Sequence, residues 1–483
     1  MRLRRVLLTL AMITGLPLFA AAEDLRDLLT NFLSQGITLA ASPVFSHEAH
    51  FVAALSQFTA FNQLNQQLAN ELSSFPLPSS SGGFTYTYDP KLGTFTRGSD
   101  SFGPFFAERA DTVGKGRFNV GLNYSHFTFD QINDINLNDG SLKLVFQHQS
   151  LVRPGGGPPF FFEGDVIQAQ LRMKITSDVT ALVATYGVSN RFDLGFALPL
   201  AHVSLEPQSD LVINRLATGS DPVFKNVHQF RTGADADPSC VAVSVDVEQG
   251  CRQSGSASGI GDVLVRAKFR LTDSPTAGVA LATDARFPTG REEDLLGTGV
   301  FQIRAFLIAS AHLGPFSPHV NAGYTWAIHR CLGLSDQPPT PVAGEEPSPS
   351  PRDVCRTEHT GGLSDVIDYT GGFDLALGSR ITFAGDVIGR TFRKTHVIQV
   401  QDTPFTANTA NNVFNPNVPP VYVTTNLPQL VAPEGDLNTL LGSVGFKINP
   451  FGNLLVTING LFPIVKKGLT DKFTPTVALD YAF

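Results

Sequence analysis

The carboxy-terminal stretch, residues 474–483, alternates regularly between apolar residues and small or polar ones. The apolar positions are Val477, Leu479, Tyr481 and the terminal Phe483. Because successive side chains point to opposite faces of a β-strand, these four residues share one face. The pattern predicts a strand whose two faces contact different solvents.

Further runs with a period of two follow one another from about Lys115 onward. They cover residues 117–129, 142–149, 165–188, 191–205, 262–271, 277–288, 299–311, 317–327, 365–377, 380–391, 436–448 and 453–463. A helix cannot use this period, and no stretch beyond the amino terminus is long enough for a membrane-spanning helix. Closed barrels are the remaining way to satisfy every backbone polar group in lipid. We therefore expect an all-β fold, a transmembrane antiparallel β-barrel of about 12–14 strands formed by residues 114–483.

The lengths of the connections assign the two ends of this barrel. Tight connections are expected at 189–191, 272–276, 314–316, 378–380 and 450–453, and long ones at 206–258, 328–364 and 393–435. Outer-membrane barrels have short periplasmic turns and long outer loops, which puts both termini in the periplasm and requires an even strand count. The count is about twelve if 165–188 is one strand and 142–149 belongs to an outer loop. It is about fourteen if 165–188 breaks near Ser177 and 142–149 spans the membrane.

The amino terminus has the three parts of a secretory signal. Arg2, Arg4 and Arg5 precede a short apolar run that ends in three alanines. This order predicts a signal peptide over residues 1–22, removed after Ala22. The run is shorter than the roughly twenty residues that a membrane anchor needs.

Composition agrees with a chain that is largely covered by lipid. Of 483 residues, 42% are hydrophobic and only 16% are charged, whereas soluble surfaces carry about 25–35% charged residues. The net charge of −8 and the lack of a basic stripe argue against a nucleic-acid partner. The strand ending on Tyr481 and Phe483 also resembles the closing strand of bacterial outer-membrane barrels. This resemblance implies a location in the bacterial cell outer membrane, contact with its lipid, and recognition of the terminal Phe by the barrel-assembly machinery.

The four cysteines lie in two segments rich in Pro, Gly, Ser and Asp. Cys240 is near Cys251, and Cys331 is near Cys355. Oxidising compartments permit disulfides, so each pair is predicted to staple one loop. A zinc site is the weaker alternative because CxxC spacing is lacking, and we expect no metal and no cofactor.

Residues 23–113 differ from the barrel and are expected to form an amino-terminal periplasmic arm. Apolar residues recur there in steps of three and four, at Phe51, Leu55, Phe58, Phe61, Leu64, Leu68 and Leu72. This spacing predicts an amphipathic helix that ends before Pro76, on the periplasmic side or at the membrane surface.

The end of the arm has the features of a small plug. Turn residues at Asp89, Pro90 and Gly93 separate two short alternating runs, which predicts a hairpin. The adjacent opposite charges of Glu108 and Arg109 suggest a plug that pairs with groups in the lumen. An ordinary linker is the alternative.

Charged residues line the lumen if the apolar face of each strand points to lipid. The inward set is then Arg172, Lys174, Asp193, Arg266, Lys268, Arg270, Asp284, Arg286, Arg304, Asp374, Asp386, Arg390 and Asp480. A pore lined by both signs would favour water and polar or amphiphilic solutes. A salt-bridge network that only fills a narrow barrel is the alternative.

Several motifs of the barrel region resemble one known family. They are Tyr186-Gly187-Val188-Ser189-Asn190-Arg191-Phe192-Asp193-Leu194-Gly195 with Pro199, Gly259-Ile260-Gly261-Asp262 with Ala267-Lys268-Phe269-Arg270, Pro288-Thr289-Gly290, and Gly297-Thr298-Gly299. They look like the signatures of the MetA-pathway of phenol degradation family of outer-membrane proteins, over roughly residues 180–330. The resemblance implies passage of hydrophobic or aromatic molecules across the outer membrane, in loose analogy with long-chain fatty-acid transporters. The long arm and the stapled loops depart from that pattern.

We therefore expect a channel or transporter for small-molecule solutes rather than an enzyme. No GxSxG, GxxxxGK[ST], GxGxxG at a strand-to-helix step, or HExxH motif is present, and no catalytic residue is predicted. The alternative is a structural or surface-interaction barrel with a filled lumen and functional extracellular loops.

Overall fold

The structure is a computed structural model that describes most of the chain from residue 99 onward. It covers residues 99–148, 160–230, 240–244, 248–328 and 363–483, except 220, 222, 273, 275, 414 and 416. It also covers short stretches between residues 24 and 97. The predicted signal peptide, Cys331 and Cys355 lie outside the described residues. Within the described part, no helix is long and apolar enough to cross a membrane.

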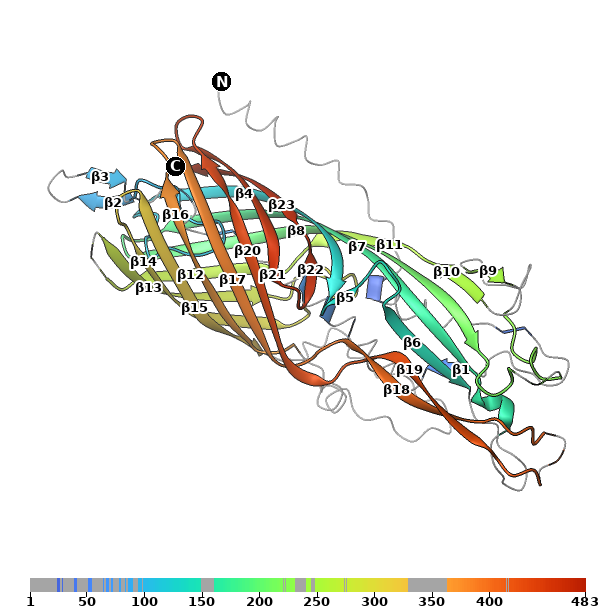
Figure 1. The fold of residues 1–483 in the computed structure, drawn as a ribbon. Helices are drawn as coiled ribbons and strands as arrows, with labels where there is room; N and C mark the ends of the chain where they lie inside the picture. Colours follow the sequence, from blue (N-terminus) through green and yellow to red (C-terminus); the bar gives the residue numbers. More distant parts are fainter. Residues whose placement is uncertain are drawn as a thin grey trace, which may run out of the picture.

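In the described part of the chain, twelve antiparallel strands close into a barrel. Figure 1 shows the strands of this barrel as a ribbon. In order around the barrel they are β4 (Phe118–Ile132), β7 (Val166–Gly187), β8 (Phe192–Asn214), β12 (Val263–Arg270) continued by β11 (Gly255–Ile260), β13 (Ala277–Phe287), β14 (Phe301–Ala311), β15 (Phe316–Ile328), β16 (Val366–Ala376), β17 (Ile381–His396), β20 (Glu434–Ile448), β21 (Leu454–Val465) and β23 (Thr474–Ala482) preceded by β22 (Leu469–Asp471). The last strand closes the sheet, since β23 pairs with β4 from Thr476 opposite Ser125 to Ala482 opposite Asn119. The predicted all-β barrel is therefore confirmed.

The structure also decides between twelve and fourteen strands. β7 runs without a break through Ser177. β6 (Leu142–His148) pairs with β7 along its outer part alone, from Leu142 opposite Leu171 onward. These residues of β7 lie beyond those that pair with β4. Residues 142–148 thus belong to the outer part, which is the twelve-strand alternative.

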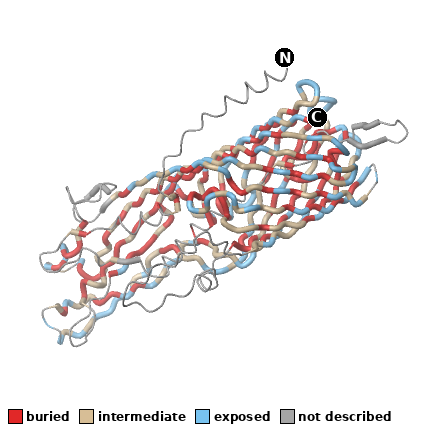
Figure 2. Tube along the Cα trace, turned by 180° about the vertical axis from the view of Figure 1, so that it is seen from behind, coloured by how far each residue is buried: buried red, intermediate tan, exposed pale blue. Residues whose placement is uncertain are grey.

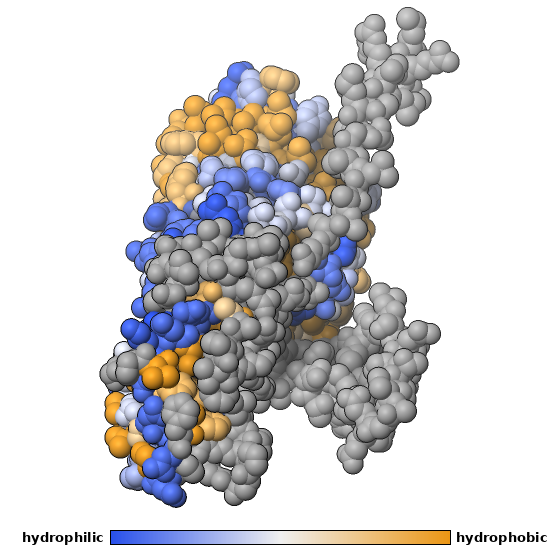
Figure 3. Space-filling view, turned by 90° about the vertical axis from the view of Figure 1, so that its right-hand side faces the viewer, coloured by the Kyte–Doolittle hydropathy of each residue, from blue (hydrophilic) through white to orange (hydrophobic). Residues whose placement is uncertain are grey.

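A band of apolar side chains surrounds the barrel near the end with the short turns. On β8 the outward residues from Phe192 to Leu200 are apolar, whereas those from His202 to Asp210 are polar. Figure 3 shows this change as a hydrophobic zone followed by a hydrophilic one. The apolar stretch has the nine or so residues that a tilted strand needs to cross a bilayer. The apolar band therefore marks the part of the barrel that spans the membrane, and the polar zone lies outside the membrane.

Aromatic rings mark both edges of this band. Near the short turns, Phe118 lies beside Phe483, and Phe373 contacts both Phe316 and Phe383. At the outer edge the Tyr324 and Trp326 rings are 5.0 Å apart, and Phe287 lies beside Phe301. Such pairs of aromatic girdles are typical of membrane–water interfaces.

The barrel wall continues far beyond the outer edge of the band. We call this part, beyond Asp178 of β7 and His202 of β8, the outer extension. The predicted long loops contribute further strands here: β9 (Cys240–Ser244) and β10 (Glu248–Arg252) pair with each other, as do β18 (Gln399–Asn408) and β19 (Tyr422–Val431). Its interior is a hydrophobic core, drawn as buried positions in Figure 2.

The described helical residues of the amino-terminal arm lie in this core, which corrects the predicted position of the helix on the periplasmic side or at the membrane surface. Leu64, Leu68 and Leu72 are helical and pack with Ile132 and Leu469 at the outer ends of their strands. The apolar stripe lies here because the inner face of the outer extension is apolar, its outer face being in contact with water.

The start of the arm departs from the prediction in two further ways. Phe51–Ala53 forms strand β1, which pairs with β6, so the helix does not begin at Phe51. Leu25 and Leu28 belong to the same outer core, and Arg26 donates its backbone N–H to Glu293 in an outer connection. The described chain therefore begins at the outer end and not in the periplasm.

The hairpin and one cysteine pair lie in the described region. β2 (Tyr86–Asp89) pairs antiparallel with β3 (Thr94–Arg97), which confirms the hairpin. Cys240 of β9 lies opposite Cys251 of β10, and Cys251 is disulfide-bonded. The staple between Cys331 and Cys355 stays a prediction.

Candidate functional site in the barrel lumen

A segment with neither helix nor strand lies inside the barrel at its periplasmic end. We call residues 99–114 the lumen segment. The first part of the segment contacts β17, where Phe102 N donates to Thr382 Oγ1 at 2.9 Å. The last part contacts a periplasmic turn, where Thr112 Oγ1 donates to the Asn190 carbonyl at 2.9 Å. The segment therefore enters and leaves the lumen at the same end.

Side chains of the barrel wall satisfy the backbone of the lumen segment. The N–H groups of Phe105 and Phe106 donate to Asp386 Oδ2 at 3.1 and 3.0 Å. Ala110 N donates to Ser310 Oγ at 3.0 Å, and Val113 N donates to Asp193 Oδ2 at 3.0 Å. A buried backbone without regular structure needs such partners, and here the wall strands supply them.

Glu108 binds one side of the lumen. Its carboxylate contacts Arg266 and lies 3.4 Å from Lys268 Nζ, both on β12. Its backbone N–H donates to Asn321 Oδ1 at 2.7 Å, and Asn321 Nδ2 donates to its carbonyl at 2.9 Å. Its side chain and backbone thus join β12 to β15.

Arg109 binds the next strand of the wall, β16, which pairs with β15. Its guanidinium contacts both Asp374 on β16 and Ser101, and its side chain is fully buried. His319 adds to the same cluster, with Nε2 2.7 Å from Asp386 Oδ1 and Nδ1 3.5 Å from Asp374 Oδ1. Because a buried charge is costly without partners, these contacts determine where the segment lies.

Small residues allow the segment to lie close to the wall. A Cβ atom on Gly278 of β13 would lie 2.8 Å from the Cβ of Ala110. One on Gly187 would lie 1.9 Å from the carbonyl oxygen of Gly114. Ala107 and Ala110 are fully buried, so this part of the lumen segment has no room for larger side chains.

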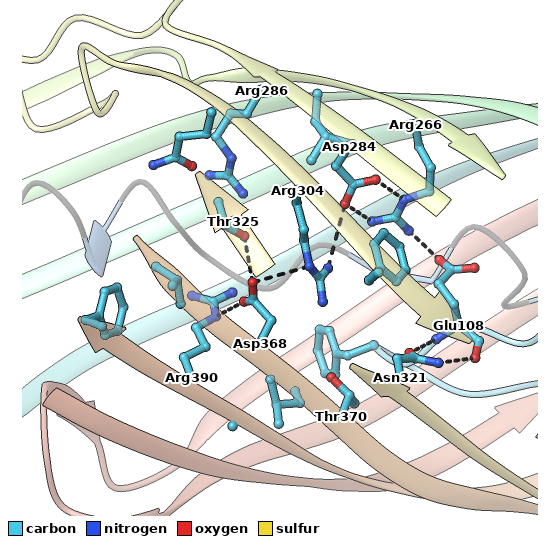
Figure 4. Close-up of a pocket in the computed structure, with 18 residues that line it drawn as sticks. Glu108, Arg266, Asp284, Arg286, Arg304, Asn321, Thr325, Asp368, Thr370 and Arg390 are labelled. Carbon is cyan, nitrogen blue, oxygen red and sulfur yellow. Dashed lines mark hydrogen bonds and ion pairs between the residues drawn. The ribbon is translucent and has the colours of Figure 1, made fainter. Parts of the chain in front are cut away.

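A cavity of about 100 Å³ lies next to the lumen segment, with Phe106 and Glu108 among its lining residues. Figure 4 shows its charged side chains, which come from strands β12 to β17 and point toward one another. Asp284 lies 2.6 Å from Arg266 and 3.7 Å from Arg304. Asp368 lies 3.4 Å from Arg304 and 3.8 Å from Arg390.

Eleven of the thirteen residues predicted to line the lumen face inward. Five of them line the cavity: Arg266, Asp284, Arg286, Arg304 and Arg390. Asp480 lines a smaller pocket, and Arg270 lies 3.2 Å from Asp111 of the lumen segment. The other four are buried: Asp193, Lys268, Asp374 and Asp386. The structure therefore gathers them around the lumen segment.

The prediction is wrong for Arg172 and Lys174. Both lie on the outer face of β7, with side chains 37% and 59% exposed, and they pair with Asp210 and Glu206 of β8. Their strand lies outside the membrane there, so water contacts the outer face, and the apolar residues Leu171, Met173 and Ile175 point inward. The rule that the apolar face contacts lipid holds only within the band.

Other inward residues were not in the predicted set. Lys447 is buried and donates to the Pro104 carbonyl at 2.6 Å, and Asp368, His319 and Asn321 lie at the lumen as described. Each occupies the inward register of its strand, so a strict count of alternate positions could have identified them.

Among the carboxyl groups outside the membrane-spanning strands, Glu71 in the arm and Asp111 in the lumen segment have shifted pKa values. Burial raises the pKa of Glu71 to about 7, although Gln67 and the Leu469 N–H donate to it. For Asp111, burial acts to raise the pKa, but the hydrogen bond to His312 and nearby positive charges outweigh it and hold the pKa below its usual value.

Comparison with protein families gives one match. Residues 153–327 match the sequence model of the family described as "Putative MetA-pathway of phenol degradation". This part of the chain is similar to that family. The match includes the motifs between residues 180 and 327, and it confirms the resemblance seen in the sequence. Among curated proteins, no relative matches the chain.

Three solved structures are similar to this chain at 10–12% sequence identity. An outer membrane channel from Pseudomonas putida F1 is 11% identical, with 77% of this chain and 98% of that one covered and a TM-score of 0.40. The CymD monoaromatic hydrocarbon channel is 12% identical, the match covers 76% of this chain and 88% of that one, and the TM-score is 0.30. The Ralstonia pickettii toluene transporter TbuX is 10% identical, covering 77% and 90%, with a TM-score of 0.26. Similarity this distant says nothing about the solute of this chain.

The structure offers no metal-binding cluster among its described residues, where no group of three or more His, Cys, Asp or Glu could hold an ion. The expectations that the chain is not an enzyme and needs no cofactor stay predictions.

Proposed function

We propose that the protein is an outer-membrane channel for small molecules, including hydrophobic or aromatic ones, with the lumen segment as its plug. The observation that carries the proposal is the combination of a cavity in the lumen with a separate segment that closes the periplasmic end. Polar contacts to Asp374, Asp386 and Asp193 help to hold this segment. Water can replace such contacts when the segment moves.

The topology makes that movement compatible with an intact barrel. The lumen segment enters and leaves at the same end and pairs with no wall strand, so its displacement breaks no strand ladder. The family match to phenol degradation fits a route for aromatic compounds.

The second candidate is a surface-interaction barrel whose outer extension is the working part. It is favoured by one observation, the hydrophobic core that the outer extension has of its own. In that case the lumen segment only fills the barrel, and solute passage is not expected.

Single-channel conductance separates the two candidates. We would refold the wild-type chain and a variant with residues 99–113 replaced by a short Gly/Ser linker, and record both in planar bilayers. The linker fits because both ends of the removed part lie at the periplasmic end. A channel predicts low conductance for the wild type and a large increase for the variant. Silence of both, with heat-modifiable barrels on gels, would contradict it.

A further inference from the structure

Two chemically different kinds of side chain line the cavity beside the lumen segment. Arg304, Arg390 and Arg286 contribute guanidinium groups, while Val366, Ile388 and Phe392 are apolar and nearly fully buried. Polar and apolar groups that converge on one concave site are the usual composition of a small-molecule site.

Guanidinium groups are numerous around this cavity. Four arginines line it, at positions 266, 286, 304 and 390, together with three carboxylates, at 108, 284 and 368. Asp284 and Asp368 are each shared between two guanidinium groups. Among the described residues, the buried Arg304 Nε has no hydrogen-bond partner. A planar carboxylate would supply the missing acceptor and suits the paired N–H donors of a guanidinium.

The aromatic lining adds a second constraint. Phe306 lies under the arginines, with the Arg304 guanidinium carbon 4.2 Å from its ring centroid and that of Arg266 at 5.4 Å. Phe106 and Phe392 also line the cavity. Its volume of about 100 Å³ is of the order that one benzene ring occupies in a protein cavity. The site therefore suits a single ring.

We propose that this cavity binds a small aromatic carboxylate on its way through the barrel. The proposal rests on the channel function proposed above and names the class of solute. The carboxylate contacts Arg286, Arg304 and Arg390, and the ring contacts the phenylalanines and aliphatic side chains. A neutral ring would leave the buried Arg304 Nε without a hydrogen-bond partner, and a sugar acid would place hydroxyl groups against the apolar side chains.

Calorimetric titration of the purified full-length protein with benzoate tests the proposal. Benzyl alcohol supplies the ring without charge, acetate the charge without a ring, benzylammonium the opposite charge, and glucuronate a sugar acid. We expect benzoate to bind at least about tenfold more tightly than each of these probes, since a hydrogen bond to a charged group is worth about 1.5–3 kcal/mol. Equal or tighter binding of any of them would overturn the proposal.

Three variants locate the site. Arg390→Gln should weaken benzoate binding by about tenfold or more, whereas Arg172→Gln, an arginine paired on the outer face of β7, should leave it unchanged. Asp368→Asn removes a carboxylate that competes for the same arginines and should tighten binding by about tenfold, which misfolding cannot imitate. Weaker binding by Asp368→Asn, or an equal loss with Arg172→Gln, would contradict the assignment.

The outcome can be separated from that of the channel itself. If the linker variant conducts but benzoate shows no preference, the channel stands and the solute class is wrong. If benzoate binds as expected but the linker variant is silent, the site stands and the channel is wrong.

Discussion

At the scale of single residues, Glu71 shows how the outer core alters a surface-type side chain. It accepts hydrogen bonds from Gln67 Nε2 at 2.9 Å and from Leu469 N at 2.5 Å, and burial raises its pKa to about 7. A carboxyl whose pKa is higher in the folded state binds a proton more readily there than in the unfolded chain. Its contribution to stability is therefore present at low pH and is lost as the pH rises from about 4.5 to about 7.

We expect the contact between the arm and β22 to weaken between pH 5.5 and 8. Hydrogen exchange of residues 64–72, corrected for intrinsic rates, should show less protection at pH 8 in the wild type. Glu71→Gln cannot ionise, so its protection should be the same at both pH values. A wild type with pH-independent protection would show that Glu71 does not titrate in this range.

At the scale of elements, the lumen segment depends on its close approach to β13. A side chain at Gly278 would occupy the space of Ala110, whereas Gly371, on the lipid side of β16, has a single neighbouring atom at 4.0 Å. Gly278→Leu should therefore displace the segment while the barrel remains closed. Overpacking costs about 1–3 kcal/mol, so the open fraction should rise by roughly 5- to 150-fold.

Conductance of the two glycine variants checks this expectation. Gly278→Leu should open more often than the wild type, and Gly371→Leu should behave like the wild type. Equal conductance of all three, with folded barrels, would mean that the contact between Gly278 and Ala110 does not keep the segment in place.

At the scale of the whole molecule, the position of the membrane follows from where the outer face changes polarity. On β8, Phe196 is 40% exposed in the middle of the apolar band, while Ser204 has the same outward register in the outer extension. Phe196→Arg should lower the free energy of unfolding in lipid vesicles by about 2–4 kcal/mol. Ser204→Arg, opposite Thr176 and Ser256, should change it by less than about 0.5 kcal/mol. If denaturant titrations gave equal losses of unfolding free energy for both variants, the membrane boundary would not lie between these two positions.

The sequence alone determined the barrel, because a period of two is a local property. The strands predicted at 262–271 and 277–288 are found as β12 and β13 with nearly the same ends. The pairing of Glu108 and Arg109 with lumen groups also followed from charge, although the partners Arg266 and Asp374 could not be named.

Only the tertiary structure decided which solvent each face contacts. Arg172 and Arg266 occupy similar alternating patterns, yet one faces water outside and the other faces the lumen, since β7 extends beyond the membrane. The position of Leu68 in the outer core could likewise not be predicted from the sequence. An apolar stripe on a helix indicates that the helix packs against another apolar surface, and the fold determines where that surface lies.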